Sequence, residues 1–196
     1  MQSSMNIIEI IVLNIELSSI GESAVNELLY PISEDIFKKL VNIRFNNINE
    51  GFNNFKNVTL ESEVTEEAEE NIIQFMKESI NLNGEENSYV DLYISTLDNE
   101  SKERLIGLLT EEDKGIMGRI QDVFNEDTIY FRLTKEIIPF ITRLSTREIL
   151  FCTVYFTKYP LTIWGNYDKR FPCFFINDEI MKLYKDIAKA CNIKII

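Results

Sequence analysis

The chain has 196 residues, of which 45% are hydrophobic and 27% charged, the balance of a globular protein rather than of a disordered or fibrous one. A chain of this length can bury a sizeable core without a disulfide or a metal to hold it together. Only 7 Gly and 4 Pro occur, which favours regular elements joined by short connections. The formal net charge of −12 at pH 7 argues against a polyanion as the main partner.

The first apolar run and the cysteines indicate the cellular compartment in which we expect the protein. The run Ile10–Leu13 is too short to span a membrane, and no Lys or Arg precedes it, as a secretory signal would require. Cys152, Cys173 and Cys191 are odd in number and lack CxxC spacing, so we expect reduced core thiols rather than a disulfide framework or a zinc site. We therefore expect a cytoplasmic protein that uses no cofactor and no metal.

Charge is distributed unevenly along the chain. Residues 1–49 carry a net charge of −3, residues 50–130 carry −14, and residues 131–196 carry +5. An acidic middle beside a mildly basic end bears on partners and on the electric field around the protein, and not on its fold.

Apolar periodicity and capping residues predict the elements of the first half. Ser33 is a suitable N-cap because acidic residues follow it, and Pro31 separates its helix from an earlier one. The Asn-rich segment 46–57 shows no clean period and predicts a loop held by its phenylalanines. In chain order we expect a buried strand at 5–16, a helix at 23–30, a helix after Ser33, a strand at 58–60, a helix capped by Thr65 and ended by Asn83-Gly84, a half-buried strand at 89–97 and a helix from Asp98 or Asn99.

The second half predicts a β-meander followed by a helix. Turn signals at Tyr159-Pro160 and Gly165-Asn166 divide three apolar segments from one another. In chain order we expect a strand at 128–133, a short helix interrupted near Pro139, strands at 149–157, 161–164 and 171–176, a helix capped by Asn177 and a closing strand at 193–196.

These elements predict an α+β fold with a mixed or largely antiparallel sheet and helices mainly on one face. We expect one globular domain over residues 1–196, which can be subdivided into an acidic α/β part at 1–127 and a meander with its helix at 128–196. No internal repeat and no heptad run occurs.

The chain contains no histidine, which removes the commonest general base near neutral pH and the commonest zinc ligand. Neither GxxxxGK[ST] nor GxGxxG is present, so no phosphate-binding loop is predicted. Cys173 lies near Lys169 and Arg170, which could lower the pKa of a thiol, but its place in an apolar strand favours core packing.

Carboxylates are therefore the remaining route to catalysis. Paired Asp and Glu can act as acid and base or hold a hard cation, which would make the protein a hydrolase or a divalent-metal enzyme. This alternative predicts a deep pocket in which two or three carboxylates converge and have raised pKa values. An acidic chain also forms such clusters by chance on a solvated surface. The candidates are Asp122, Glu126 and Asp127, and Glu111, Glu112 and Asp113.

A second interpretation of the acidic residues is a surface that faces a partner. Carboxylates stabilise helix starts and keep a protein soluble, but a contiguous set also attracts a basic protein. The residues that we expect to contact the partner are Glu66, Glu67, Glu69, Glu70, Glu111, Glu112 and Asp113.

Aromatic and basic residues alternate around the turns of the meander. Such a set can form part of a protein interface, stack on the bases of a nucleic acid, or pack an ordinary sheet. The second candidate interface comprises Trp164, Tyr167, Lys169 and Arg170.

Small size, absent catalytic motifs and a concentrated acidic region together predict a non-catalytic protein inhibitor. We expect an immunity, antitoxin or anti-defence protein of bacterial type that binds a basic, nucleic-acid-acting protein. The alternatives are the carboxylate enzyme described above and a nucleic-acid binder that uses the basic C-terminal third. The latter predicts affinity that falls steeply with salt.

Overall fold

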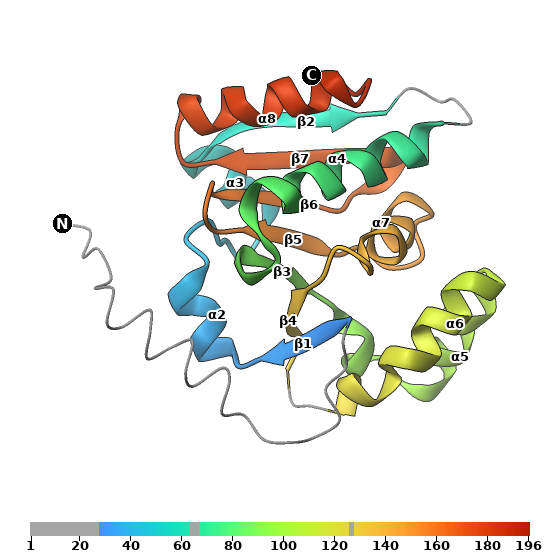
Figure 1. Ribbon diagram of the computed structural model, residues 1–196. Coiled ribbons are helices and arrows are strands. Elements are labelled where there is room, and N and C mark those ends of the chain that lie inside the picture. Colours follow the sequence, from blue (N-terminus) through green and yellow to red (C-terminus); the bar gives the residue numbers. More distant parts are fainter. Residues whose placement is uncertain (1–27, 63–66, 126–127) are drawn as a thin grey trace.

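The computed structural model describes residues 28–62, 67–125 and 128–196 (Figure 1). These residues form an eight-stranded, wholly antiparallel sheet combined with helices, which confirms the predicted α+β class. The strand predicted at 5–16 and the cap predicted at Thr65 lie outside the described residues. No helix in the described part of the chain has both the length and the apolar character needed to cross a membrane.

The strand order in the sheet is β1-β4-β3-β5-β6-β7-β2-β8, so strands from the parts of the chain before and after residue 127 are interleaved in one sheet. Strands β5, β6 and β7 are consecutive neighbours and form the predicted meander. The bounds of the strands are β1 Leu29–Ile32, β2 Lys56–Glu61, β3 Ser88–Asp91, β4 Tyr130–Leu133, β5 Thr153–Phe156, β6 Leu161–Trp164, β7 Arg170–Phe175 and β8 Lys194–Ile195.

The helices are divided between the two faces of the sheet. The longer helices α4 and α8, together with α7, cover one face, and α2 and α3 lie on the other (Figure 1). The bounds of the α-helices are α2 Glu34–Leu40, α3 Ile48–Asn54, α4 Ala68–Asn83, α5 Asn99–Leu108, α6 Glu111–Ile120, α7 Ile138–Thr146 and α8 Asp178–Ala190. Short 3-10 turns are η1 Glu85–Asn87, η2 Tyr93–Thr96, η3 Gln121–Asn125 and η4 Tyr167–Lys169.

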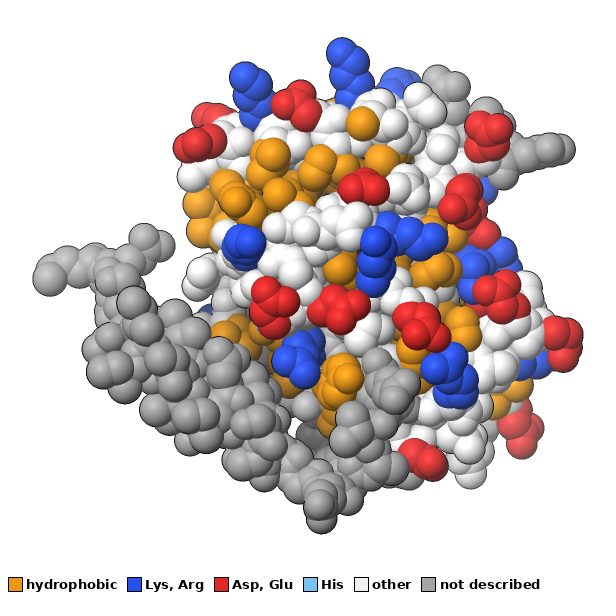
Figure 2. Space-filling model, viewed as in Figure 1, with side chains coloured by type: hydrophobic (Ala, Val, Ile, Leu, Met, Phe, Trp, Pro, Cys, Tyr) orange, Lys and Arg blue, Asp and Glu red, His pale blue; other side chains and the backbone are white. Residues whose placement is uncertain are grey.

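The main hydrophobic core lies between the sheet and helices α4, α7 and α8. Alternate strand residues such as Val154, Ile163 and Cys173 point into it, because successive side chains of a strand face opposite sides. On the helix side the core receives the predicted apolar stripe of α4 and the fully buried Phe140 of α7. In Figure 2 hydrophobic side chains also reach the surface between α8 and α4.

A buried polar network joins three elements within this core. Asn83, the last residue of α4, donates from Nδ2 to the Tyr184 hydroxyl of α8 at 2.7 Å and accepts the Tyr159 N–H at 2.9 Å. The Tyr184 hydroxyl donates in turn to the Tyr159 carbonyl oxygen at 2.8 Å. Because these buried groups satisfy one another, they fix the end of α4 against α8 and the turn between β5 and β6.

The local helix signals are confirmed where the structure describes them. The Ser33 side chain caps α2, Asp98 caps α5 and Asn177 caps α8, each by accepting a backbone N–H three residues ahead. Gly84 ends α4 with φ of +86°, a value that glycine adopts without strain.

Three predictions in the first half are wrong within the described residues. Leu29 and Tyr30 lie in β1 instead of at the end of the helix predicted at 23–30, and Pro31 is tolerated in this strand because β1 is an edge strand. The Asn-rich segment contains α3, because Asn47 accepts the Glu50 N–H and the Glu50 carboxylate accepts the Asn46 N–H. The predicted strand at 89–97 ends at Asp91 and continues as η2.

Other boundaries also differ from the prediction. Helix α7 is not interrupted by Pro139, which lies in its first turn where a missing N–H costs no helical hydrogen bond. Strand β5 covers only four of the residues predicted at 149–157. Helix α6 was not anticipated as a separate element.

Gly165 follows strand β6 of the meander and lies against Ser145 of α7. A Cβ atom at this position would lie 2.7 Å from the Cys152 carbonyl oxygen and 2.8 Å from the Ser145 hydroxyl oxygen. In contrast, a Cβ at Gly118 in α6 would meet no atom within 4 Å.

We predict that Gly165→Ala lowers the free energy of unfolding by about 1–3 kcal/mol through this overlap, because the obstructing atom belongs to the backbone. The matched change Gly118→Ala should raise it by about 0.5–1 kcal/mol, since alanine restricts the unfolded chain and favours helix. Urea unfolding measures both. Equal effects of the two substitutions would contradict the packing at Gly165.

Candidate functional site

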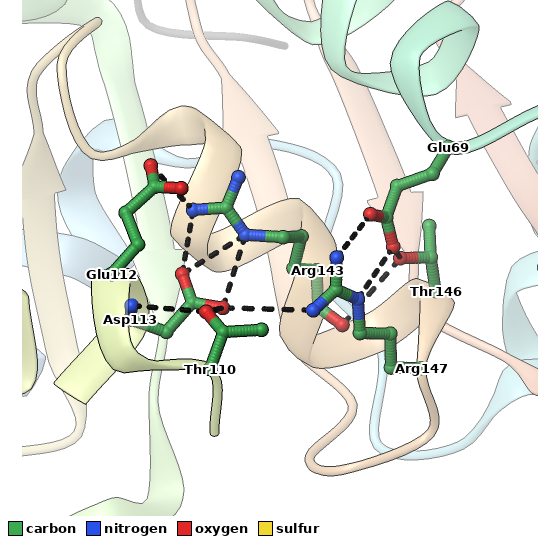
Figure 3. A network of polar contacts seen from close by, with 7 residues as sticks. All are labelled: Glu69, Thr110, Glu112, Asp113, Arg143, Thr146 and Arg147. Atoms are coloured by element: carbon green, nitrogen blue, oxygen red, sulfur yellow. Dashed lines mark hydrogen bonds and ion pairs between the residues drawn. The ribbon is translucent and has the colours of Figure 1, made fainter. Parts of the chain in front are cut away.

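The first turn of α6 is fixed by a reciprocal cap. Thr110 accepts the Asp113 N–H on its hydroxyl oxygen at 3.2 Å, and the same hydroxyl donates to Asp113 Oδ2 at 2.9 Å. Because the cap holds both the backbone and the side chain, it orients the Asp113 carboxylate toward α7 (Figure 3).

Asp113 and Arg143 form a buried ion pair between α6 and α7. The side chains are 1% and 11% exposed, and Arg143 Nη2 lies 2.5 Å from Asp113 Oδ1. Arg143 Nε donates to both carboxylate oxygens, at 2.9 and 3.1 Å. A fork of this kind is the strongest geometry that an arginine and a carboxylate can adopt, and it fixes one helix relative to the other.

Arg147, one turn further along, connects the same network to α4. It donates to Glu69 from Nε at 2.9 Å and from Nη2 at 2.5 Å, and its Nη1 lies 3.8 Å from Asp113 Oδ2. The Thr146 hydroxyl donates to the same Glu69 carboxylate at 2.6 Å. Partial burial acts to raise the pKa of Glu69, but these hydrogen bonds outweigh it and leave the pKa below its ordinary value.

The predicted partner-binding carboxylates of α4 and those of α6, about 40 residues apart in the sequence, therefore meet around α7 through Glu69, Glu112 and Asp113. Figure 3 shows Arg143 and Arg147 projecting from α7 between the carboxylates of α6 and Glu69. We call this set the α7 network: Glu69, Thr110, Glu112, Asp113, Arg143, Thr146 and Arg147.

The predicted partner-binding carboxylates differ in their exposure. Glu67 and Glu70 are exposed beside the α7 network, and the Glu111 and Glu112 side chains are 90% and 73% exposed. Asp113 is buried in its ion pair and Glu69 is half-buried, so these two hold the surface together and are not free to contact a partner. Glu66 lies outside the described residues.

The four residues of the second candidate interface lie on β6, η4 and the start of β7. Trp164 stacks on Phe45 with ring centroids 5.4 Å apart, which makes it part of the packing of the sheet's second face. Arg170 is exposed and donates to Glu61 at 2.8 Å. Tyr167 is 61% exposed and Lys169 is half-buried, both in the turn η4. Tyr167 and Arg170 are thus the exposed side chains of this set, and Arg170 is paired with Glu61.

Asp91 is a buried carboxylate that the sequence did not single out. It is 5% exposed, and among the described residues no Lys or Arg forms an ion pair with it. Its oxygens accept the Thr153 N–H at 2.6 Å and the Tyr155 hydroxyl at 3.0 Å. Burial raises the pKa of Asp91 to about 6, although both hydrogen bonds act to lower it. Its place within an ordinary strand pattern gave no signal in the sequence.

The remaining candidates for catalysis do not converge. Within the described ranges, no group of three or more Asp, Glu, Cys or His is placed to hold a metal ion. Asp122 is exposed, while Glu126 and Asp127 lie outside those ranges. Cys152, Cys173 and Cys191 are free and buried, as predicted, and burial raises the pKa of each thiol, which makes a thiolate nucleophile unfavourable.

No protein-family model matches the chain, and neither the curated proteins nor the solved structures include one that is significantly similar to it.

We predict that Arg143→Met lowers the free energy of unfolding by about 3–5 kcal/mol, because it leaves the Asp113 carboxylate buried without its main counter-charge. As a control, Lys38→Met removes the partner of Glu34 in an exposed pair and should leave the free energy of unfolding nearly unchanged, because water and salt screen such a pair. Urea unfolding of both variants tests the difference. A loss at Arg143 as small as that at Lys38 would show that the α7 network does not hold α6.

We predict that Asp91 makes stability depend on pH. Because its folded pKa is raised to about 6 from 3.8, its contribution to stability is full below about pH 4 and is lost as the pH rises through 6. The Asp91→Asn amide carries no charge: its oxygen can accept the Thr153 N–H, and its Nδ2 can donate to the Tyr155 hydroxyl oxygen in place of the bond that Asp91 accepts from that hydroxyl. The variant should therefore gain on the native protein by an amount on the order of 3 kcal/mol between pH 4 and pH 8. Urea unfolding at the two pH values measures this gain. A difference between the two proteins that does not change with pH would contradict the prediction.

Proposed function

We propose that this protein is a non-catalytic inhibitor that binds a basic protein through an acidic surface at the starts of α4 and α6. The observation that carries the proposal is that carboxylates of α4 and of α6 bind Arg143 and Arg147 together. This brings the exposed carboxylates at the starts of both helices into one region. We call the exposed members the acidic surface: Glu67, Glu70, Glu111 and Glu112.

The charge of this region exceeds what its internal pairing requires. The starts of α4 and α6, with the residue before α4, carry six carboxylates, and three cations form ion pairs with four of them, so negative charge remains after the ion pairs are formed. In Figure 2 acidic and basic side chains alternate over this part of the molecule. The carboxylates are Glu67, Glu69, Glu70, Glu111, Glu112 and Asp113, and the cations are Lys114, Arg143 and Arg147. An excess of this sign attracts a basic partner and speeds its encounter.

Two exposed apolar side chains adjoin the acidic surface. Ile106 and Leu108, at the end of α5, are 42% and 57% exposed and precede Glu111 by only a few residues. Protein interfaces combine apolar anchors with a polar rim, whereas a surface that serves only solubility has no need of exposed leucine. This arrangement favours a protein partner over a free polycation.

We propose further that the protein is an inhibitor of the immunity, antitoxin or anti-defence type, and that its basic partner acts on nucleic acid. The support for this is the sign of the surface: carboxylates imitate the charge of a phosphate backbone, so a protein that acts on nucleic acid is a natural target. The carboxylate enzyme and the nucleic-acid binder remain alternatives, and no observation in the described residues favours either of them.

We predict that charge reversal at Glu67, Glu70 and Glu111 abolishes partner binding without unfolding the protein. Glu112 is left unchanged because it contacts Arg143. The matched control reverses three other carboxylates in first helical turns, Glu34, Asp178 and Glu179, and makes the same change in net charge. The measurement is retention of proteins from lysate of the source organism, at low and high salt, read by mass spectrometry.

The proposal expects a basic protein that the native chain and the control variant retain at low salt. The surface variant should lose that protein, and high salt should weaken its retention. Equal loss in both variants would mean that only net charge matters, and the absence of any specific basic protein would contradict the inhibitor function.

A further inference from the structure

The turn that carries Tyr167 has an unusual backbone. Asp168 and Lys169 are consecutive non-glycine residues in the left-handed region, with φ of +59° and +53°. Such a conformation costs roughly 1–2 kcal/mol for each residue, and strain of this kind gathers at functional sites. Asn192 has a similar φ, but it follows α8, where helix ends commonly adopt this conformation.

Two contacts with the loop after α7 hold this turn in place. Glu148, itself at φ of +55°, accepts the Asp168 N–H on Oε1 at 3.0 Å. Phe151 packs edge-on against Tyr167 with ring centroids 4.7 Å apart. The two loops therefore support each other's strained backbone, and the result is a fixed position for the Tyr167 ring.

The chemistry around that ring suits a cation. Tyr167 is 61% exposed, so most of its surface is open. Among the described residues, neither Glu148 nor Asp168 forms an ion pair, and both lie in the two strained loops that adjoin the ring. The cations of the turn are Lys169 and Arg170, and the Arg170 guanidinium points to Glu61, which it shares with Lys194.

This turn is also continuous with the α7 network. Glu148 directly follows Arg147, whose guanidinium group is bonded to Glu69 beside the acidic surface. Helix α7 contacts η4 as well as α4, so the turn and the start of α4 adjoin the same helix. The turn that carries Tyr167 and the network beside the acidic surface thus both lie against α7.

We propose that Tyr167 is the aromatic anchor of the binding surface and receives an arginine side chain of the basic partner. The guanidinium group lies over the phenol ring and its N–H groups reach the carboxylates of Glu148 and Asp168. An arginine suits this place because it stacks on aromatic rings and bonds carboxylates at the same time. The inference rests on the proposed function, since it assumes that the acidic surface binds a protein.

Site-specific photocrosslinking tests the anchor in cells of the source organism. A benzoylphenylalanine side chain is placed at Tyr167, at Leu108 beside the acidic surface, and at Phe52 as a control. Phe52 is 41% exposed and lies on α3, on the opposite face of the sheet. The proposal expects one basic protein to be linked at positions 167 and 108 and not at 52, and expects reversal of Glu67, Glu70 and Glu111 to remove both links.

The outcomes separate this inference from the function on which it rests. A basic protein linked at position 108 but not at 167, or different proteins at the two positions, overturns the anchor and leaves the acidic surface intact. No protein linked at either position overturns both.

Affinity for the linked protein then measures the anchor. Tyr167→Ala should weaken binding by about 30-fold or more, as loss of an interface hot spot does, whereas Tyr167→Phe keeps the ring and should stay within a few-fold. Phe52→Ala is the control and should leave the affinity unchanged. A loss of affinity in Tyr167→Ala no larger than in Phe52→Ala contradicts the anchor.

Discussion

Arg143 brings a guanidinium group into the interior of the protein, where a charge without a partner is very unfavourable. The need to compensate it determines the arrangement of the region around α7. Asp113 meets it from α6, and Arg147 extends the same set of contacts to Glu69 at the start of α4. Three elements distant in the sequence are thereby held in one position, and Glu111, whose ion pair is with Lys114 of its own helix, remains exposed beside them. The acidic surface is therefore a consequence of how the fold neutralises one buried cation.

Local signals in the sequence predicted much of the fold but little of this site. The helices capped by Ser33 and Asn177 were found because a cap and its helix are neighbours in the chain. The first half of β1 was mistaken for the end of a helix, since the strand is defined by its pairing with β4, about 100 residues later, and an edge position is what permits Pro31. Periodicity likewise cannot show that Arg143 and Asp113, 30 residues apart, share a charge. The sequence alone led us to expect the acidic Asp113 on the surface, whereas it is buried in the structure.

The two charged groups buried most deeply have different consequences. The Asp113 carboxylate has an arginine and a threonine hydroxyl as partners, and it joins helices to one another. Asp91 has only neutral donors, from β5, so it joins two strands and makes their stability sensitive to protons. A chain without histidine has few groups that titrate near pH 6. Asp91 therefore gives the sheet a dependence on pH.

Helix α7 holds the starts of α4 and α6 in one fixed arrangement. Spin labels on Glu67→Cys and Glu111→Cys report the distance between these two points, and the three native cysteines are buried and poorly reactive. The distribution of distances, measured by pulsed electron spin resonance in the native background and in Arg143→Met, is the most direct test. The account predicts a single narrow distribution that broadens when Arg143 is replaced. A broad distribution in the native background, or one that Arg143→Met leaves unchanged, would contradict it.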